Sequence, residues 1–204
     1  VFSEYGRIFL DDEEFIGLFE GFAGTNDYHA LDRKYSLDQL LKLATTIPGD
    51  TAECGSFQGA SSYLICRRIA GSGRQHHVFD SFEGLSEPGA SDGDWWKRGD
   101  LIYPEEMVRK NLARFDFVHL HKGWIPTRFE DVAGAKFCLV HVDVDLYEPT
   151  LDSIRFFYGR MSPGGFMVFD DYGFTTCPGA KKAVDDFFAD KPESVILLAT
   201  GQAF

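Results

Sequence analysis

After residue 49 the chain alternates between short apolar runs and longer segments in which apolar residues recur at helical spacing. The apolar runs predict strands, at about 50–55, 76–82, 117–122, 136–144, 165–170 and 194–199. The segments between them predict helices, at about 59–71, 104–114, 149–161 and 178–190. This alternation indicates an α/β fold, a doubly wound and mostly parallel sheet with helices on both faces.

The runs "FCLVHV" and "FMVF" are almost entirely apolar, as strands covered on both faces are. From residue 36 onward we expect strand order 3-2-1-4-5 with a short antiparallel edge near 194–204. The edge is predicted from "VILLATGQAF", whose pattern indicates a strand, a turn at Gly201 and the start of another strand.

Two helices precede the first strand in this interpretation. "DDEEFIGLFEGF" has apolar residues at helical spacing, and "SLDQLLKLATTIPG" begins with a predicted capping box of Ser36 and Gln39. The pattern divides the chain into an N-terminal helical or lid segment, 1–35, and one domain, 36–204. Residues 83–103 form a Gly-, Pro- and Asp-rich loop too long for an ordinary connection, and its pair Trp95-Trp96 predicts either a lid or a loop anchor.

Composition narrows the class of partner. The 204 residues carry a net charge of −12, from 20 basic and 32 acidic residues, which disfavours nucleic acid and anionic membranes and suits small molecules or metal cations. The four cysteines are scattered and read as reduced core residues. No apolar run approaches a membrane span, so a cytoplasmic protein is expected, although the chain starts at Val1 without Met. A homo-oligomer stays open.

Ligands of an open parallel sheet bind beyond the carboxyl ends of its strands. The first strand ends in "AECGSFQGAS", with Glu53, Gly55 and Gly59 ahead of Ser61, and the second ends at Asp80. Glycines there allow close approach of a ligand, and an acid about 25 residues later suits ribose hydroxyls. The glycine turn alone fits a plain strand–helix connection equally well, but together with Asp80 it favours an adenosine-type cofactor.

Acidic residues stand at the ends of two later strands. Asp143 and Asp145 follow one buried run, and Asp170 and Asp171 follow the next. Neighbouring parallel strands lie about 4.8 Å apart, so Asp143 and one or both of the later pair could share a hard divalent cation such as Mg²⁺. The alternative is that these acids cap the helices that follow.

Several strings, in order from about 49 to 190, resemble the macrocin O-methyltransferase family. They are "GDTAECGSFQGAS", "FDSFEGLSEP", "KGWIPTRF", "HVDVDLYEPTLDSI", "MSPGGFMVFDDYG" and "AVDDF". The resemblance implies a class I, Rossmann-like enzyme that uses S-adenosylmethionine and a divalent metal to methylate a hydroxyl of a sugar or glycosylated natural product. The chain departs from the family's pattern at Ser56-Phe57-Gln58 and at His141, where an Arg is expected.

The resemblance also implies roles for individual residues. Gly55, with Glu53, Ser56 and Phe57, would hold the methionine end of the cofactor, and Ser61 would lie near its carboxylate. Asp80 would bind the ribose, and the adenine would lie among Ser81, Phe82, Gly123 and Trp124. Asp143, Asp170 and Asp171 match the metal ligands, and Asp143 also matches the general base and a cofactor contact. Asp145 would support these ligands or cap the next helix.

Other readings stay open at this point. A phenolic or catechol acceptor uses the same metal chemistry, although its second acidic tip tends to read Asp-Asn. A phosphatase of haloacid dehalogenase type also uses DxD and DD tips, but this chain lacks a Lys between 146 and 169 and has its DxD on the fourth strand. A DxD glycosyltransferase leaves the glycine turn and Asp80 unexplained. A non-catalytic cofactor-binding subunit is the remaining alternative.

Overall fold

The computed structural model describes residues 6–22 and 30–204. Its centre is a five-stranded sheet in which every neighbouring pair is parallel and the order is β3-β2-β1-β4-β5. The strands are β1 (Asp50–Cys54), β2 (His76–Asp80), β3 (Val118–Lys122), β4 (Phe137–Val142) and β5 (Met161–Phe169). The doubly wound α/β fold and the strand order predicted from the sequence are thus confirmed.

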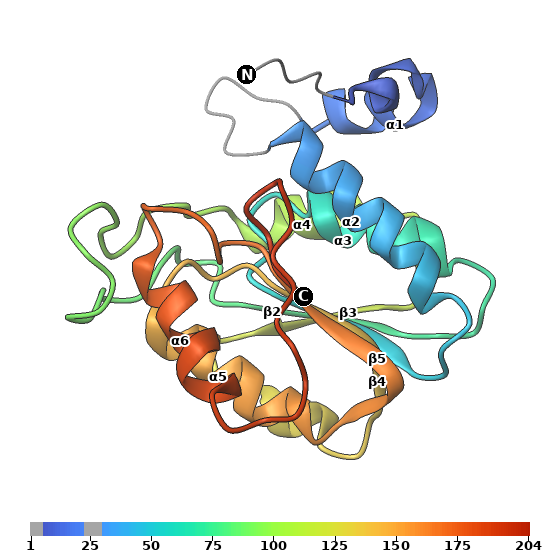
Figure 1. The fold of residues 1–204 in the computed structure, drawn as a ribbon. Coiled ribbons are helices and arrows are strands. Elements are labelled where there is room, and N and C mark those ends of the chain that lie inside the picture. Colours follow the sequence, from blue (N-terminus) through green and yellow to red (C-terminus); the bar gives the residue numbers. More distant parts are fainter. Residues whose placement is uncertain (1–5, 23–29) are drawn as a thin grey trace.

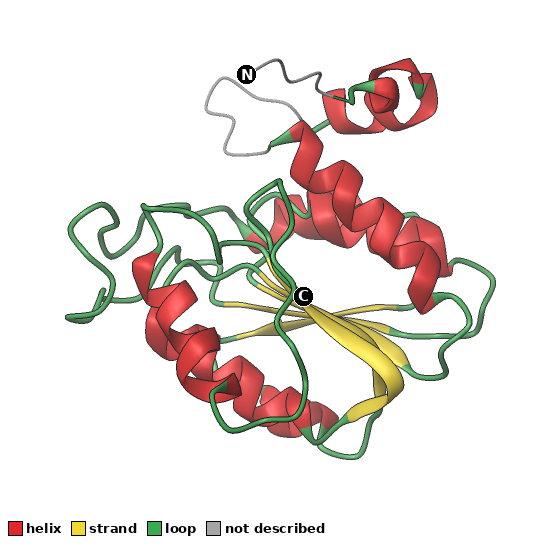
Figure 2. Ribbon diagram, in the orientation of Figure 1, coloured by secondary structure: helices red, strands yellow, loops and turns green. Residues whose placement is uncertain are grey.

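Helices cover both faces of this sheet (Figures 1 and 2). One face carries α2, α3 and α4, and the other carries α5 and α6. The bounds are α1 (Glu13–Glu20), α2 (Leu31–Ala44), α3 (Ala60–Ile69), α4 (Glu105–Leu112), α5 (Tyr147–Tyr158) and α6 (Pro178–Phe188), with 3₁₀ turns η1 (Ile8–Asp11) and η2 (Phe129–Val132). Within the described residues, no helix is both long and apolar enough to span a membrane.

Two apolar clusters, one on each face, fix the sheet between the helices. On the α5 and α6 side, Phe137, Phe157 and Val184 are fully buried in one cluster. On the other side, Phe15 of α1 packs with α2, α3 and buried residues of β4 and β5. β4 is buried at every position, which explains why its sequence is apolar apart from His141.

The predicted antiparallel edge near 194–204 is present but short, and Ile196 N–H donates to Phe204 O at 2.8 Å. This segment forms isolated antiparallel bridges, Leu197 to Ala203 and Ala203 to Phe169, rather than a continuous strand. The turn at Gly201 is present, and Gly201 N–H donates to Leu198 O at 3.0 Å. Gln202 pairs with Leu198 in this hairpin through its backbone carbonyl, and its side chain binds Asp170 in the interior, as described below.

The predicted capping box at Ser36 is wrong, because α2 begins five residues earlier at Leu31 and Ser36 lies inside the helix. Ala30 precedes the helix and makes no side-chain cap. The first turn of α2 contains Arg33 and Lys34, whose side chains form ion pairs with aspartates beyond β4 and β5. These tertiary contacts hold the first turn in place of a local cap. The helix also runs across the predicted segment boundary between residues 35 and 36.

The carboxyl ends of β1 and β4 approach each other closely at Gly55. Asp143 N–H donates to Cys54 O at 2.9 Å, and Gly55 has φ +81. A Cβ added to Gly55 would lie 1.9 Å from the carbonyl oxygen of Asp143. The glycine is therefore required by contact as well as by backbone conformation, and it brings the first strand's loop against the fourth strand's acids.

We predict that Gly55→Ala lowers the free energy of unfolding more than Gly59→Ala does. Gly59 has a similar φ of +86, but a Cβ there would meet Val108 at 3.4 Å, an ordinary contact. Both variants bear the left-handed strain of about 1–2 kcal/mol, and only Gly55→Ala adds the clash. Urea denaturation of both variants measures the difference, and equal losses would contradict the close approach.

The burial of the His76 ring predicts that the free energy of unfolding depends on pH. Its ring is fully buried, with Nδ1 2.9 Å from Thr51 Oγ1 and Nε2 3.1 Å from Ser62 Oγ. Burial, with smaller contributions from neighbouring His77 and His141, lowers the pKa of His76 to about 3. Between pH 6.5 and that value the unfolded chain binds the extra proton, so stability falls as pH drops, by up to about 1.4 kcal/mol per pH unit from this group.

Denaturation curves of His76→Gln between pH 7 and pH 4 should show a shallower loss of stability than the wild type. His119→Gln is the control, because His119 is exposed on β3 and should change the slope less. An unchanged slope in His76→Gln would mean that the folded protein protonates this ring.

Candidate functional site

A cavity opens at the carboxyl ends of β1, β2 and β4, where the sequence predicted a cofactor. Its empty volume is about 940 Å³, including space open to solvent. The predicted residues that line it are Gly55, Ser56, Phe57, Asp80, Ser81, Trp124 and Asp143. Cavities of this size are typical of small-molecule sites.

Asp80 connects the carboxyl end of β2 to the loop after β1 through hydrogen bonds. Its Oδ2 accepts hydrogen bonds from Ser56 N–H at 2.7 Å and Ser56 Oγ at 2.9 Å, and its Oδ1 accepts from Phe82 N–H at 2.7 Å. A carboxylate has about four acceptor positions, so Asp80 can still accept from a ligand hydroxyl. The loop after β3 is tied to the same place, because Gly123 N–H donates to Asp80 O at 2.9 Å and so brings Trp124 to the cavity.

Phe82, Gly123 and Glu53, also predicted to bind the cofactor, do not line this cavity. Ser61 lines an adjoining second lobe of the cavity, described below. The Phe82 side chain is buried with Val108 of α4, and Gly123 contributes its backbone. The Glu53 carboxylate is 1% exposed and accepts from Ser62 Oγ, so it lies in the interior below the cavity floor. Ser61 lies in the first turn of α3.

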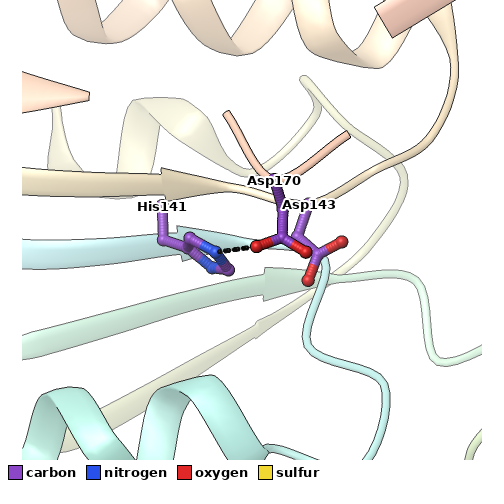
Figure 3. Close-up of side chains that lie close together, drawn as sticks. All are labelled: His141, Asp143 and Asp170. Atoms are coloured by element: carbon purple, nitrogen blue, oxygen red, sulfur yellow. Dashed lines mark hydrogen bonds and ion pairs between the residues drawn. The ribbon is translucent and has the colours of Figure 1, made fainter. Parts of the chain in front are cut away.

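The predicted acids gather just beyond β4 and β5 (Figure 3). His141, Asp143 and Asp170 each place a ligand atom within 4.8 Å of the others, and Asp145, Asp171 and Cys177 form a second such group. The three carboxylates predicted as metal ligands are thus divided between two adjoining groups.

The His141 ring lies between two carboxylates, those of Glu53 and Asp170. Its Nδ1 lies 2.9 Å from Glu53 Oε1 and its Nε2 3.2 Å from Asp170 Oδ1, the contact dashed in Figure 3. Burial opposes a charged ring, but the hydrogen bonds to Asp170 and Glu53 and their negative charges raise the pKa of His141 to about 9. The ring is therefore an imidazolium at neutral pH and donates from both nitrogens.

Two further cations come from the first turn of α2. Arg33 NH1 donates to Asp170 Oδ2 at 2.5 Å and lies 3.8 Å from Asp171 Oδ1. Lys34 Nζ donates to Ser61 Oγ at 2.6 Å and lies 3.6 Å from Asp143 Oδ2. Sequence reasoning missed both residues and assigned the compensating charge to a metal alone. The available signal was two basic residues in a helical first turn, where the helix dipole disfavours them.

Asp170 is the most fully paired of the acids. It is completely buried, and Oδ1 also accepts from Gln202 Nε2 at 2.6 Å. Burial alone would raise the pKa of Asp170, but Lys34, His141 and Arg33 hold it well below its usual value. Asp170 is thus a permanent carboxylate around which the cations are arranged.

Asp145 and Asp171 have fewer positive partners. Asp145 has φ +60, and its backbone N–H donates to Asp171 Oδ2 at 3.0 Å. Burial, together with repulsion from Asp143, raises the pKa of Asp145 to about 7. Burial and the neighbouring aspartates raise the pKa of Asp171 well above its usual value.

Carboxyl groups therefore outnumber the cations in this part of the site, and a bound cation would favour the ionised forms of Asp145 and Asp171. Among the described residues the clustered carboxylates are Glu53, Asp143, Asp145, Asp170 and Asp171, and the cations beside them are Arg33, Lys34 and His141. A cationic ligand is favoured there.

The cavity continues past Asp143 into a second lobe. Ser56, Phe57, Leu101, Asp143 and Asp145 line both lobes. The second lobe adds α2, through Arg33 and Lys34, and the long 83–103 loop, through its two tryptophans. Trp96 Nε1 donates to Cys177 Sγ at 3.3 Å, whereas Trp95 is 65% exposed. The loop is therefore anchored through Trp96 and presents Trp95 at the surface.

Comparison with known proteins gives this site a context. The family model of macrocin-O-methyltransferase (TylF) matches residues 29–194. The chain is 35% identical over 159 residues to 8-demethyl-8-(2,3-dimethoxy-alpha-L-rhamnosyl)-tetracenomycin-C 4'-O-methyltransferase of Streptomyces olivaceus, covering 71% of this chain and 60% of that protein. It is 30% identical over 161 residues to demethyldecarbamoylnovobiocin O-methyltransferase of Streptomyces niveus, covering 72% and 61%.

Solved structures of methyltransferases have a similar fold. The O-methyltransferase NovP superposes with a TM-score of 0.70 at 27% identity, covering 87% of this chain and 81% of that one. The calicheamicin methyltransferase CalS11 shares the fold, with a TM-score of 0.74 at 16% identity over 99% and 93% of the two chains. The chain spans about 60% of the length of the curated relatives it matches. Over most of its own length, the chain belongs to the macrocin-O-methyltransferase (TylF) family.

Proposed function

We propose that this chain transfers a methyl group from S-adenosylmethionine to a hydroxyl of a sugar carried by a natural product, with the assistance of a divalent metal. The observation that carries the proposal is the continuous cavity that joins Asp80, at the tip of β2, to Asp143, at the tip of β4. A methyl donor bound along it would have its ribose at one end and its sulfonium near the acids. The relatives' names support a sugar acceptor, since one acts on a rhamnosyl tetracenomycin.

The charge distribution suits this cofactor. S-adenosylmethionine carries a sulfonium and an ammonium against one carboxylate, so its net charge is positive. The cavity wall near Asp143 and Asp145 carries the excess of carboxylates described above. Asp80 would accept from the ribose hydroxyls, and Trp124 with Ser81 would bound the adenine.

The residues present fit a magnesium ion by their chemistry. Asp143, Asp170 and Asp171 offer only oxygen ligands, which Mg²⁺ prefers. Burial and the neighbouring aspartates raise the pKa of Asp171, and a bound cation would favour its ionised form. Asp170 Oδ2 could bind the ion only after Arg33 NH1 has moved from its contact at 2.5 Å. When bound, the metal would lower the pKa of an acceptor hydroxyl.

Asp143 is the candidate general base. Its side chain is 27% exposed and lines both lobes of the cavity, in contrast to the buried Asp170. Its carboxylate would accept the proton of the acceptor hydroxyl as that oxygen forms its bond to the methyl carbon. The carbon–sulfur bond breaks with its electron pair on sulfur, so S-adenosylhomocysteine leaves as a neutral thioether and needs no acid.

We predict that Asp143→Asn lowers methyl transfer by about 100-fold or more, because it removes the base and one negative charge at constant shape. Cofactor affinity, determined mainly at β1 and β2, should change little. Chelation by EDTA should abolish turnover, and added Mg²⁺ should restore it. Transfer of an isotope-labelled methyl group to a glycosylated acceptor measures both effects.

Asp190→Asn is the matched control, since Asp190 is an exposed carboxylate paired with Lys191. It should leave transfer unchanged. Undiminished transfer in both the chelated enzyme and Asp143→Asn would refute the metal and base roles and favour helix capping by these acids.

A further inference from the structure

Lys34 is a buried cation to which the proposed methyl-transfer mechanism assigns no role. It is 3% exposed, and its ammonium has three N–H donors. Among the described residues, its hydrogen-bond acceptor is Ser61 Oγ at 2.6 Å, with Asp143 Oδ2 farther away at 3.6 Å. A buried ammonium of this kind retains capacity to bind a further acceptor.

The ammonium lies where the cavity meets α3. Lys34, Ser61, Ser56 and Phe57 line the same lobe, so a ligand there can reach Lys34 directly. Ser61 belongs to the first turn of α3, and Gly59, which precedes that helix, provides no side-chain cap. The N–H groups of a helical first turn and an adjacent ammonium together favour a negatively charged group.

Arg33, the neighbouring cation, is arranged differently. Its guanidinium lies against Asp170 and 4.7 Å above the ring of Phe174. Arg33 donates directly to the buried acid, whereas the Lys34 ammonium donates to Ser61 in the first turn of α3. The two adjacent basic residues therefore have separate environments and can be tested against each other.

We propose that Lys34 binds the carboxylate of the methionine moiety of S-adenosylmethionine, with Ser61 as its partner. This inference rests on the proposed function, because it requires the donor to lie in the cavity described. Asp143 Oδ2 lies 3.6 Å from the same ammonium, so the proposed carboxylate site adjoins the acid that faces the methyl donor. Lys34 is thus a specificity-determining residue for the intact amino acid.

The test compares two ligands that differ in this carboxylate alone, S-adenosylmethionine and decarboxylated S-adenosylmethionine. Calorimetry in one buffer measures both affinities for wild type, Lys34→Met and Arg33→Met. The wild type should prefer the carboxylated ligand by about tenfold or more, the usual strength of a hydrogen bond to a charged group. Lys34→Met should reduce that preference to within about twofold, and Arg33→Met should keep it.

The possible results distinguish a failure of the Lys34 inference from a failure of the proposed function. If Lys34→Met keeps the wild-type preference, or if the wild type has no preference, Lys34 serves only as a countercharge and the inference is overturned. If the wild type binds neither ligand, the proposed function itself fails. Asp80→Ala, which removes the ribose acceptor, should weaken both ligands equally and checks that they share one site. Unequal weakening would show separate sites and would also overturn the inference.

Discussion

The buried carboxylates beyond β4 and β5 are the constraint on which the rest of this structure depends. An isolated carboxylate in the interior is unfavourable, so Asp170 requires the cations that surround it. His141 supplies one from β4 and Arg33 supplies another from α2, while Gln202 of the C-terminal hairpin adds a hydrogen bond. Segments far apart in the sequence thereby meet at one point, beside the second lobe of the cavity, which Arg33 and Asp171 line.

This arrangement explains what could be predicted from the sequence. Strand order and the gathering of acids follow from local patterns, because apolar runs mark buried strands and parallel strands end at one edge. The start of α2 could not be predicted, since its first turn is held by the contact of Arg33 with Asp170. The compensating charge was expected from a metal, whereas Arg33 and Lys34 supply a share of it. The two basic residues of "DRKYS" signal a charged partner, but the local sequence does not show that the partner lies more than 100 residues away.

Family membership argues against the phosphatase and glycosyltransferase alternatives, and the geometry adds detail within the family. The expected Arg before the DxD motif is His141 here, and its raised pKa of about 9 keeps a positive charge between Glu53 and Asp170. Asp145 and Asp171, whose pKa values are raised, line the part of the cavity in which a sulfonium and a metal would be placed, and a positive charge there would favour their ionised forms.

A crystal structure of the chain with bound S-adenosylhomocysteine tests most directly whether the cavity and the acids form one methyl-transfer site. The ribose hydroxyls are expected on Asp80 and the sulfur atom in the part of the cavity that faces Asp143. A ligand found outside this cavity, or one whose sulfur faces away from the acids of β4 and β5, would contradict that conclusion.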